Sequence, residues 1–220
     1  MVFADRVFAD RNDAGRQLGE LVNTYLGTAA HGALVLALPR GGVPIGLAVA
    51  EAIGGDLDVV VARKIGFPGH AELAMGAVCE EGPPVFNDTV LAQAGLTADE
   101  LAGLVEAERH EARRRMRRYR GDRPPPPIAG RLVIVVDDGL ATGATARAAL
   151  RSVRSQHPAR LVFAAPVCAP DAPAILRDAD DVLCVTAPEQ LIAVGRWYDR
   201  FEQLTDAEVD HHLAVAHHAA

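Results

Sequence analysis

Residues 131–148, RLVIVVDDGLATGATARA, decide the fold of this chain. The stretch opens with an apolar run rich in β-branched residues, 132–136, which predicts a buried strand. Asp137 and Asp138 follow at once, and after them come a loop of small residues and an alanine-rich segment that predicts a helix from about Ala144. The sequence therefore predicts a strand, a tight loop and a helix in succession, with two acids at the end of the strand.

This order of elements suits a ligand that carries an anion at one end and hydroxyl groups at the other. Small residues let backbone N–H groups approach an anion closely, and the following helix directs its positive end at the same place. Thr142 and Thr145 add hydroxyl donors, whereas the ionised Asp137 and Asp138 only accept hydrogen bonds. An ordinary strand–turn–helix corner is the alternative, but two adjacent buried charges each need a partner. We therefore predict a sugar-phosphate site.

The segment DDGLATGAT, with the apolar run before it, resembles the signature of type I phosphoribosyltransferases. The resemblance implies an α/β fold with a Rossmann-like parallel sheet, a flexible lid loop and a small C-terminal hood. It also implies that Asp137 and Asp138 hold the ribose 2- and 3-hydroxyls of phosphoribosyl pyrophosphate (PRPP). The loop that would hold the 5-phosphate of PRPP consists of Ala141, Thr142, Gly143, Ala144 and Thr145.

A second unit of strand, glycine turn and helix lies earlier in the chain. The apolar run 33–38 predicts a strand that leads into the sequence PRGG, and a helix is expected over 43–53. Two glycines after an arginine make a loop that a ligand can approach closely beside a positive charge. A plain turn is the alternative. The resemblance identifies this segment as a pyrophosphate loop lined by Arg40, Gly41 and Gly42, a loop that often carries a cis peptide in the family.

A third apolar run, 57–62, ends in Arg63 and Lys64. Consecutive strands joined by helices predict a parallel, doubly wound sheet, and ligands of such sheets lie beyond the carboxyl ends of the strands. The charged residues named so far all follow predicted strands, so we expect them to meet at that edge. The resemblance adds Arg63 and Lys64 to the pyrophosphate site, and a solvated strand end is the alternative.

The segment 65–84 has little periodicity and several glycines and prolines, and we expect a long loop with a small strand at 77–79. By resemblance this loop is a lid that closes over the reaction and excludes water. Family members that act on 6-oxopurines carry an acid in the phosphate loop as general base. Here that position is Ala141, as in adenine-type members. Glu72 and His70 in the lid are therefore our candidate catalytic residues, with plain solvent-facing charge as the alternative.

A charged helix is expected from Ala98 to about Tyr119, before a stiff linker of four prolines at 124–127. The window 109–123 contains eight arginines and two acids. A basic helix can bind nucleic acid. Acids at i,i+3 and i,i+4 spacings to the arginines instead favour a solvated or subunit-facing helix. We therefore do not expect nucleic acid as a partner. The chain resembles a branch of the family that carries this same helix before the central strand.

The C-terminal part of the chain is expected to form the hood, which covers the acceptor base in the family. Trp197 and Tyr198 are candidates to stack on that base, and the alternative is that the single tryptophan, Trp197, fills the core of the hood. We expect a single domain with a core over 28–84 and 128–186, a helical insertion at 88–123, the hood at 187–204 and a final helix at 205–216.

Composition sets further limits. A chain of 220 residues, half of them hydrophobic, suits one domain, and its net charge of −7 gives no bulk attraction to nucleic acid or anionic membranes. No apolar run approaches ~20 residues and no secretion signal is visible, so we expect a cytoplasmic protein without membrane contact. The three cysteines are odd in number and widely spaced, which predicts reduced, buried thiols. They are Cys79, Cys168 and Cys184.

The resemblance implies a pentosyl transfer in which a nitrogen of a nucleobase-like acceptor replaces the pyrophosphate at C1 of PRPP. It implies Mg²⁺ as cofactor, held through water by Asp137 and Asp138, and it implies a homodimer. The partners would then be PRPP and a small-molecule base, whose identity the sequence does not name. The alternative function is a non-catalytic regulator that binds PRPP or a nucleotide and contacts nucleic acid through 109–123.

Overall fold

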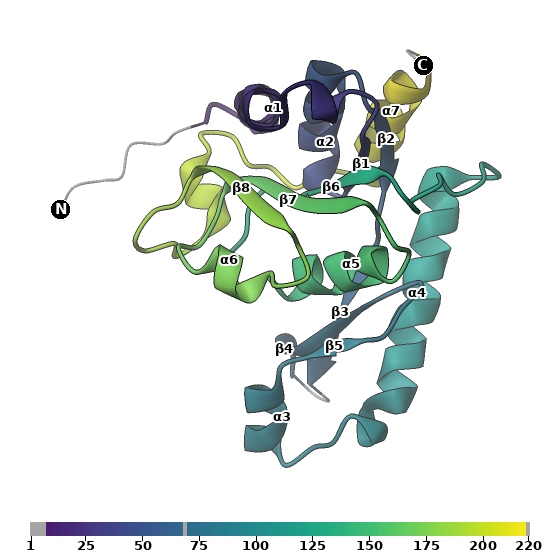
Figure 1. The fold of residues 1–220 in the computed structure, drawn as a ribbon. Coiled ribbons are helices and arrows are strands. Elements are labelled where there is room, and N and C mark those ends of the chain that lie inside the picture. Colours follow the sequence, from purple (N-terminus) through teal and green to yellow (C-terminus); the bar gives the residue numbers. More distant parts are fainter. Residues whose placement is uncertain (1–7, 68–69, 219–220) are drawn as a thin grey trace.

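A computed structural model describes residues 8–67 and 70–218 and centres on a five-stranded parallel sheet in the order β2-β1-β6-β7-β8 (Figure 1). The strands are Leu34–Ala37 (β1), Asp56–Val59 (β2), Leu132–Val136 (β6), Arg160–Val167 (β7) and Asp181–Thr186 (β8). All four neighbouring pairs are parallel. The predicted fold class, an α/β fold with a parallel sheet, is confirmed.

Helices cover both faces of this sheet (Figure 1). One face packs against α1 (Arg11–Leu26), α2 (Gly42–Ile53) and α7 (Asp206–His218), and the other against α5 (Ala144–Arg154) and α6 (Ala172–Ile175). Successive side chains of a strand point to opposite faces, so Ile134 and Val136 enter one core while Val133 and Val135 enter the other. In the part of the chain that the structure describes, no helix is both long and apolar enough to cross a bilayer.

The segment expected as a long lid loop forms a hairpin. Strand β3 (Ala62–Phe67) pairs antiparallel with β4 (His70–Cys79), and β5 (Val85–Phe86) joins β4 in a three-stranded sheet. The prediction of an irregular loop over 65–84 is therefore wrong for most of its length. The physical reason is that β4 is buried on both faces from Met75 to Cys79, so it lacks the polar–apolar alternation by which a strand is usually found.

The helical insertion joins this small sheet to the main body. It contains α3 (Asp88–Ala94), a 3₁₀ turn (Asp99–Leu101) and α4 (Ala102–Arg120). The first half of α4 packs against the hairpin through Val105, which shares a small core with Ile65 and Met75. The second half packs against the main core through Met116 and Tyr119. The helix therefore fixes the hairpin relative to the parallel sheet.

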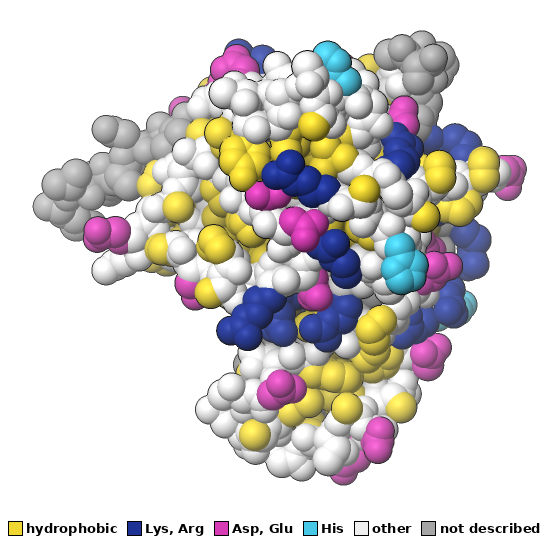
Figure 2. All heavy atoms as spheres, viewed as in Figure 1, with side chains coloured by type: hydrophobic (Ala, Val, Ile, Leu, Met, Phe, Trp, Pro, Cys, Tyr) yellow, Lys and Arg dark blue, Asp and Glu magenta, His cyan; other side chains and the backbone are white. Residues whose placement is uncertain are grey.

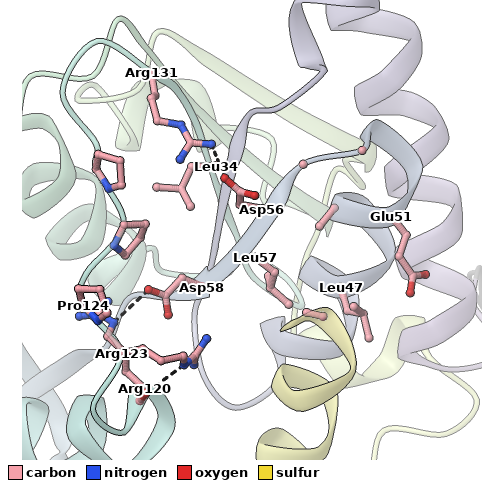
Figure 3. A pocket seen from close by; sticks show the side chains of 16 residues that line it. Leu34, Leu47, Glu51, Asp56, Leu57, Asp58, Arg120, Arg123, Pro124 and Arg131 are labelled. Atoms are coloured by element: carbon pink, nitrogen blue, oxygen red, sulfur yellow. Dashed lines mark hydrogen bonds and ion pairs between the residues drawn. The ribbon is translucent and has the colours of Figure 1, made fainter. Parts of the chain in front are cut away.

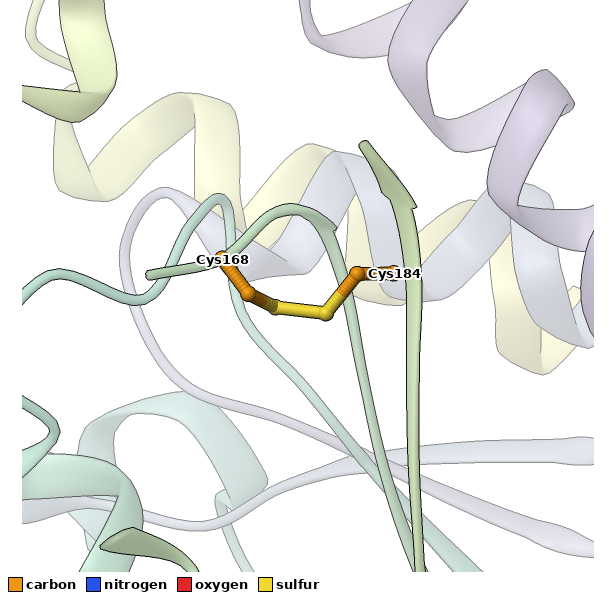
Figure 4. Close-up of a disulfide and its surroundings, with 2 residues drawn as sticks. All are labelled: Cys168 and Cys184. Carbon is orange, nitrogen blue, oxygen red and sulfur yellow. A yellow bond between two sulfur atoms is a disulfide. The ribbon is translucent and has the colours of Figure 1, made fainter. Parts of the chain in front are cut away.

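Two of the three cysteines form a disulfide. Cys168 follows β7 and Cys184 lies in β8, and their Cα atoms are 6.1 Å apart (Figure 4). Cys79 is a buried free thiol, and burial raises its pKa to about 12. The prediction of three reduced thiols is therefore wrong for Cys168 and Cys184. The parallel pairing of β7 with β8 brings together two residues that are 16 positions apart, and nothing in their spacing reveals that pairing.

Arg109 of α4 provides a first test of how the insertion holds the hairpin. Its Nη1 donates to the carbonyl oxygens of Cys79, Glu80 and Gly82, at 3.1, 3.4 and 3.0 Å. Arg109→Met removes this donor from the end of β4, and we expect the free energy of unfolding to fall by about 1–3 kcal/mol in urea titrations. Arg117→Met, at an exposed position of the same helix, should change it by less than about 0.5 kcal/mol. Equal losses in the two variants would contradict this role for Arg109.

Candidate active site

Asp137 and Asp138 lie directly after β6, at the carboxyl edge of the parallel sheet. The backbone there is anchored on both sides, because Leu38 N–H donates to Val136 O at 2.8 Å and Asp137 N–H donates to Ala164 O at 3.3 Å. Burial raises the pKa of both carboxyl groups, and the neighbouring Asp138 charge raises the pKa of Asp137 further. The edge of the sheet therefore presents two largely buried acids that need compensation.

Arg11 of α1 provides that compensation for Asp138. Its Nε and Nη2 lie 3.1 and 3.0 Å from Asp138 Oδ2, and its Nη1 donates to the Glu202 carbonyl at 2.9 Å. The guanidinium also lies 3.9 Å from the centre of the Phe201 ring. Burial raises the pKa of Asp138, and the positive charge of Arg11 partly opposes this rise. No motif marks Arg11 in the sequence, because 127 residues separate it from its partner.

Tyr198 supports the same acid from the hood. Its hydroxyl donates to the Asp138 carbonyl at 2.6 Å, and its ring packs between Phe8 and Phe201. The side chain is only 2% exposed, so neither ring face is free for a base. The prediction that Tyr198 stacks on the acceptor is therefore wrong, since the hood buries it as a support for Asp138. Trp197 stays a candidate for stacking, because it packs against the core but remains partly exposed.

The predicted phosphate loop lies between Asp138 and α5. Ala141 and Thr142 are exposed, and Gly143 adopts a left-handed conformation (φ 73°) at the start of α5. Within the described residues, the backbone N–H groups of 141–145 donate to no protein acceptor. The positive end of the α5 dipole lies at the same place. The loop can therefore offer several donors to an anion.

The PRGG segment packs directly against the acid pair. The peptide bond between Pro39 and Arg40 is cis, in line with the form often seen in the family that the sequence resembles. A Cβ atom on Gly41 would overlap Asp138 Oδ2, and one on Gly42 would lie 2.7 Å from Val136 O. Only glycine permits this approach. The structure thus packs the PRGG segment against the acids at the end of β6.

A cavity of about 540 Å³ borders the PRGG segment at Pro39 and the predicted phosphate loop at Thr145. It is lined by Pro39, Ala62, Arg63, Lys64, Gly66, Phe67, Leu104, Glu108, Arg115 and Thr145. Arg63 Nε lies 2.9 Å from Glu108 Oε2 of α4, and Lys64 is exposed. Figure 2 shows Lys and Arg side chains gathered where the main body meets the smaller sheet.

Arg40 is not among the residues that line this cavity. Its charge acts on the Tyr119 phenol, where it partly opposes the burial that raises the pKa of Tyr119 to about 12. The backbone of His70 and Glu72 lies in β4, but their side chains fall outside what the structure describes. Their catalytic role stays a prediction.

A larger cavity, of about 800 Å³, lies at the opposite end of the sheet, near the amino ends of β1 and β2 (Figure 3). Four of its six charged side chains form two ion pairs: Arg131 with Asp56 at 2.6 Å, and Arg120 with Asp58 at 3.0 Å. Ligands of parallel α/β sheets bind at the carboxyl ends of the strands. The candidate site is therefore at the acid pair and not in this larger cavity.

The donor set at the acid pair fits Mg²⁺ that arrives with a phosphorylated ligand. Mg²⁺ usually keeps several waters and binds one or two carboxylates together with substrate phosphates. Asp137 and Asp138 supply the carboxylates beside a loop suited to an anion. Among the described residues, no cluster of three or more acidic, histidine or cysteine side chains would hold a metal by itself.

Comparison with known proteins identifies the family. A family model described as a phosphoribosyl transferase domain matches residues 12–198, which include the acid pair, both glycine loops and the cavity. The chain belongs to the type I phosphoribosyltransferase family. The resemblance found in the sequence is thereby confirmed at the level of the family.

Two curated relatives agree with this assignment, and two solved structures resemble the chain. Two Mycobacterium tuberculosis proteins, from strains CDC 1551 and H37Rv and provisionally named phosphoribosyl transferases, are 41% identical over 213 residues, or 96% of this chain. The match covers 47% of each, so the chain spans about half the length of these curated relatives. A solved protein of Thermus thermophilus is 40% identical, with a TM-score of 0.78 over 94% of this chain and 97% of that one. An Aquifex aeolicus protein shares the fold alone. It is 12% identical, with a TM-score of 0.50 over 84% of this chain and 78% of that one.

The pairing of Arg11 with Asp138 can be tested through its pH dependence. Arg11→Met leaves a buried carboxylate unpaired, and we expect the free energy of unfolding to fall by about 3 kcal/mol at pH 7 in metal-free buffer. Burial already raises the pKa of Asp138, and loss of Arg11 raises it further. The folded variant then holds a proton that the unfolded chain releases. The loss in free energy of unfolding of Arg11→Met, relative to the unaltered protein, should therefore grow as the pH rises above the usual aspartate pKa. It should shrink on acidification.

Urea titrations at pH 5 and pH 8 would measure this deficit. Arg16→Met is the matched control on α1, because Arg16 pairs with Asp13 but its side chain is 69% exposed. That variant should lose less than about 1 kcal/mol, with little change between the two pH values. A deficit for Arg11→Met that does not depend on pH would show that Asp138 is not the group it compensates.

Proposed function

We propose that the chain transfers the phosphoribosyl group of PRPP to a nucleobase-like nitrogen acceptor and releases pyrophosphate. The observation that carries this proposal is that the acid pair, against which Gly41 packs, leads directly into a loop whose N–H groups, from 141 to 145, have no acceptor among the described residues. A phosphorylated pentose presents an anion and hydroxyl donors, and this edge of the sheet presents anion donors and hydroxyl acceptors. The family assignment supports the same conclusion.

The roles of the residues follow from where charge develops. Asp137 and Asp138 would hold the ribose hydroxyls through charge-assisted hydrogen bonds, each worth ~1.5–3 kcal/mol. As the bond at C1 breaks, negative charge builds on the leaving pyrophosphate, and Arg63 and Lys64 at the cavity would stabilise it. Bound Mg²⁺ would add positive charge at the leaving group. Arg40 would contribute from the PRGG segment.

The proton-handling group is the least defined part of this proposal. The phosphate loop has Ala141 where 6-oxopurine enzymes carry an acid, so a base must come from another segment. Glu72 and His70 are the candidates we carry forward from the sequence. The identity of the acceptor base, a homodimeric assembly and a cytoplasmic location also stay predictions.

The regulator hypothesis gains little from the structure. Most arginines of the window 109–123 are engaged within the protein. Six of them bond to an acidic side chain or a backbone carbonyl, namely Arg109, Arg114, Arg115, Arg118, Arg120 and Arg123. These contacts reduce the positive charge that the helix can offer to a nucleic-acid backbone.

Incubation with PRPP, Mg²⁺ and a panel of nucleobases tests the proposed reaction. We expect pyrophosphate release with at least one base and little release with PRPP alone, because an acceptor is required to complete the transfer. The measurement is the amount of pyrophosphate formed over time. Absence of release with every base, together with salt-sensitive nucleic-acid binding, would favour the regulator instead.

Substitution of Asp138 tests the assignment of the ribose site. Asp138→Asn keeps the shape of the side chain but removes the charge that accepts from the ribose hydroxyls. We expect PRPP to bind roughly 10-fold or more weakly in calorimetry, since charge-assisted hydrogen bonds contribute about 1.5–3 kcal/mol, while the variant stays folded. Asp122→Asn, at an exposed position after α4, is the control and should bind PRPP normally. Unchanged affinity in Asp138→Asn would count against the assignment.

A further inference from the structure

The inserted helix α4 forms one wall of the cavity beside the PRGG segment. Leu104, Glu108 and Arg115 all line this cavity. Residues four and eleven positions apart lie within about 40° of each other around an α-helix, so these three form one stripe. The stripe runs beside the buried stripe that contains Val105 and Met116. The packing of α4 on the hairpin and main core therefore fixes which of its side chains reach the cavity.

The charges that line the cavity come from two elements. Strand β3 supplies Arg63 and Lys64, and α4 supplies Arg115 and a single acid, Glu108. Glu108 is already bound to Arg63 at 2.9 Å, so these two charges largely compensate each other. Arg63 therefore meets a ligand with its charge partly offset, whereas Lys64 and Arg115 have no acidic partner among the residues that line the cavity.

Arg115 is oriented for such a ligand. Its Nε donates to Glu111 Oε1 at 2.9 Å, which fixes the guanidinium from the side of the helix. Its two terminal amino groups donate to no protein acceptor within the described part of the chain. The side chain is 35% exposed, so it is partly removed from water. A planar guanidinium held in this way suits the paired oxygens of a phosphate group.

We propose that Arg115 binds the diphosphate group of the substrate, so that the inserted helix completes the leaving-group side of the site. This inference rests on the proposed function, because it takes PRPP as the source of the diphosphate. Thr145, in the loop expected to hold the 5-phosphate, lines the same cavity, and so does Pro39 of the PRGG segment. A diphosphate in the cavity would therefore lie within reach of both glycine loops.

Arg114 provides a matched control. It also pairs with Glu111, through Nε at 2.7 Å and Nη2 at 2.9 Å, but its side chain is 58% exposed and does not line the cavity. Arg114→Met and Arg115→Met therefore both remove a partner of Glu111 from the same helix. Only the second variant removes a cation from the cavity.

Calorimetry with two probes separates this inference from the proposed function. In the presence of Mg²⁺, Arg115→Met should weaken binding of inorganic pyrophosphate roughly 10- to 100-fold, the range of one charge-assisted contact. Binding of ribose 5-phosphate, which has no diphosphate, should change less than about twofold in the same variant. Arg114→Met should bind both probes like the unaltered protein.

Each outcome decides a different point. If Arg114→Met and Arg115→Met bind pyrophosphate equally well, the role of Arg115 is overturned. The proposed function still stands in that case if the protein binds ribose 5-phosphate. If the unaltered protein binds neither probe, nor PRPP, both proposals fall. If Arg115→Met does not fold, Arg115→Lys replaces it, with Arg114→Lys as control. The lysine keeps the charge but loses the planar fork, so a pyrophosphate affinity equal to that of its control would overturn the inference.

Discussion

The placement of two adjacent carboxyl groups at the end of a buried strand is the constraint on which the rest of this structure depends. Asp137 and Asp138 are held where water alone cannot compensate their charge, and burial raises the pKa of both. Arg11 and Tyr198 each bond to Asp138. The N-terminal helix, the central strand and the hood, which are far apart in the sequence, are thus tied together at one residue. A protein without a use for these acids would gain by replacing them with apolar side chains, because compensated buried charges rarely add net stability.

The parallel sheet could be predicted from the sequence, and so could the strand end at which the candidate site is proposed, because both depend on local patterns. Strand 132–136, the acids after it and the small-residue loop are contiguous, and the parallel topology brings the ends of separate strands to one edge. Contacts between distant segments could not be predicted in this way. Arg11 lies 127 positions from Asp138, and the Cys168–Cys184 disulfide exists only because β7 pairs with β8.

The hairpin and the inserted helix show a different limit. Strand β4 is buried on both faces from Met75 to Cys79, so its pattern there resembles a loop more than a half-exposed strand. Helix α4 was expected from its charges, but charge alone did not indicate which side of it would face the site. Its apolar residues decide this, because Val105 packs with the hairpin and Met116 with the main core. Glu108 and Arg115 are then directed into the cavity as a consequence of that packing.

Two residues of the PRGG segment lie in different electrostatic surroundings, and this difference bears on the proposed reaction. Gly41 packs against Asp138, whereas Pro39 borders the cavity that is lined by Arg63 and Lys64. A ribose held at the acids and a diphosphate held at the cations would lie along a field that runs from negative to positive. Breakage of the bond at C1 leaves positive charge on the sugar and negative charge on the leaving group, so the same field would stabilise both products of charge separation. Because one short segment contacts the acid at Gly41 and borders the cavity at Pro39, its backbone sets the spacing of the two environments before any ligand binds, and the protein would not need to reorganise its charges during the proposed reaction.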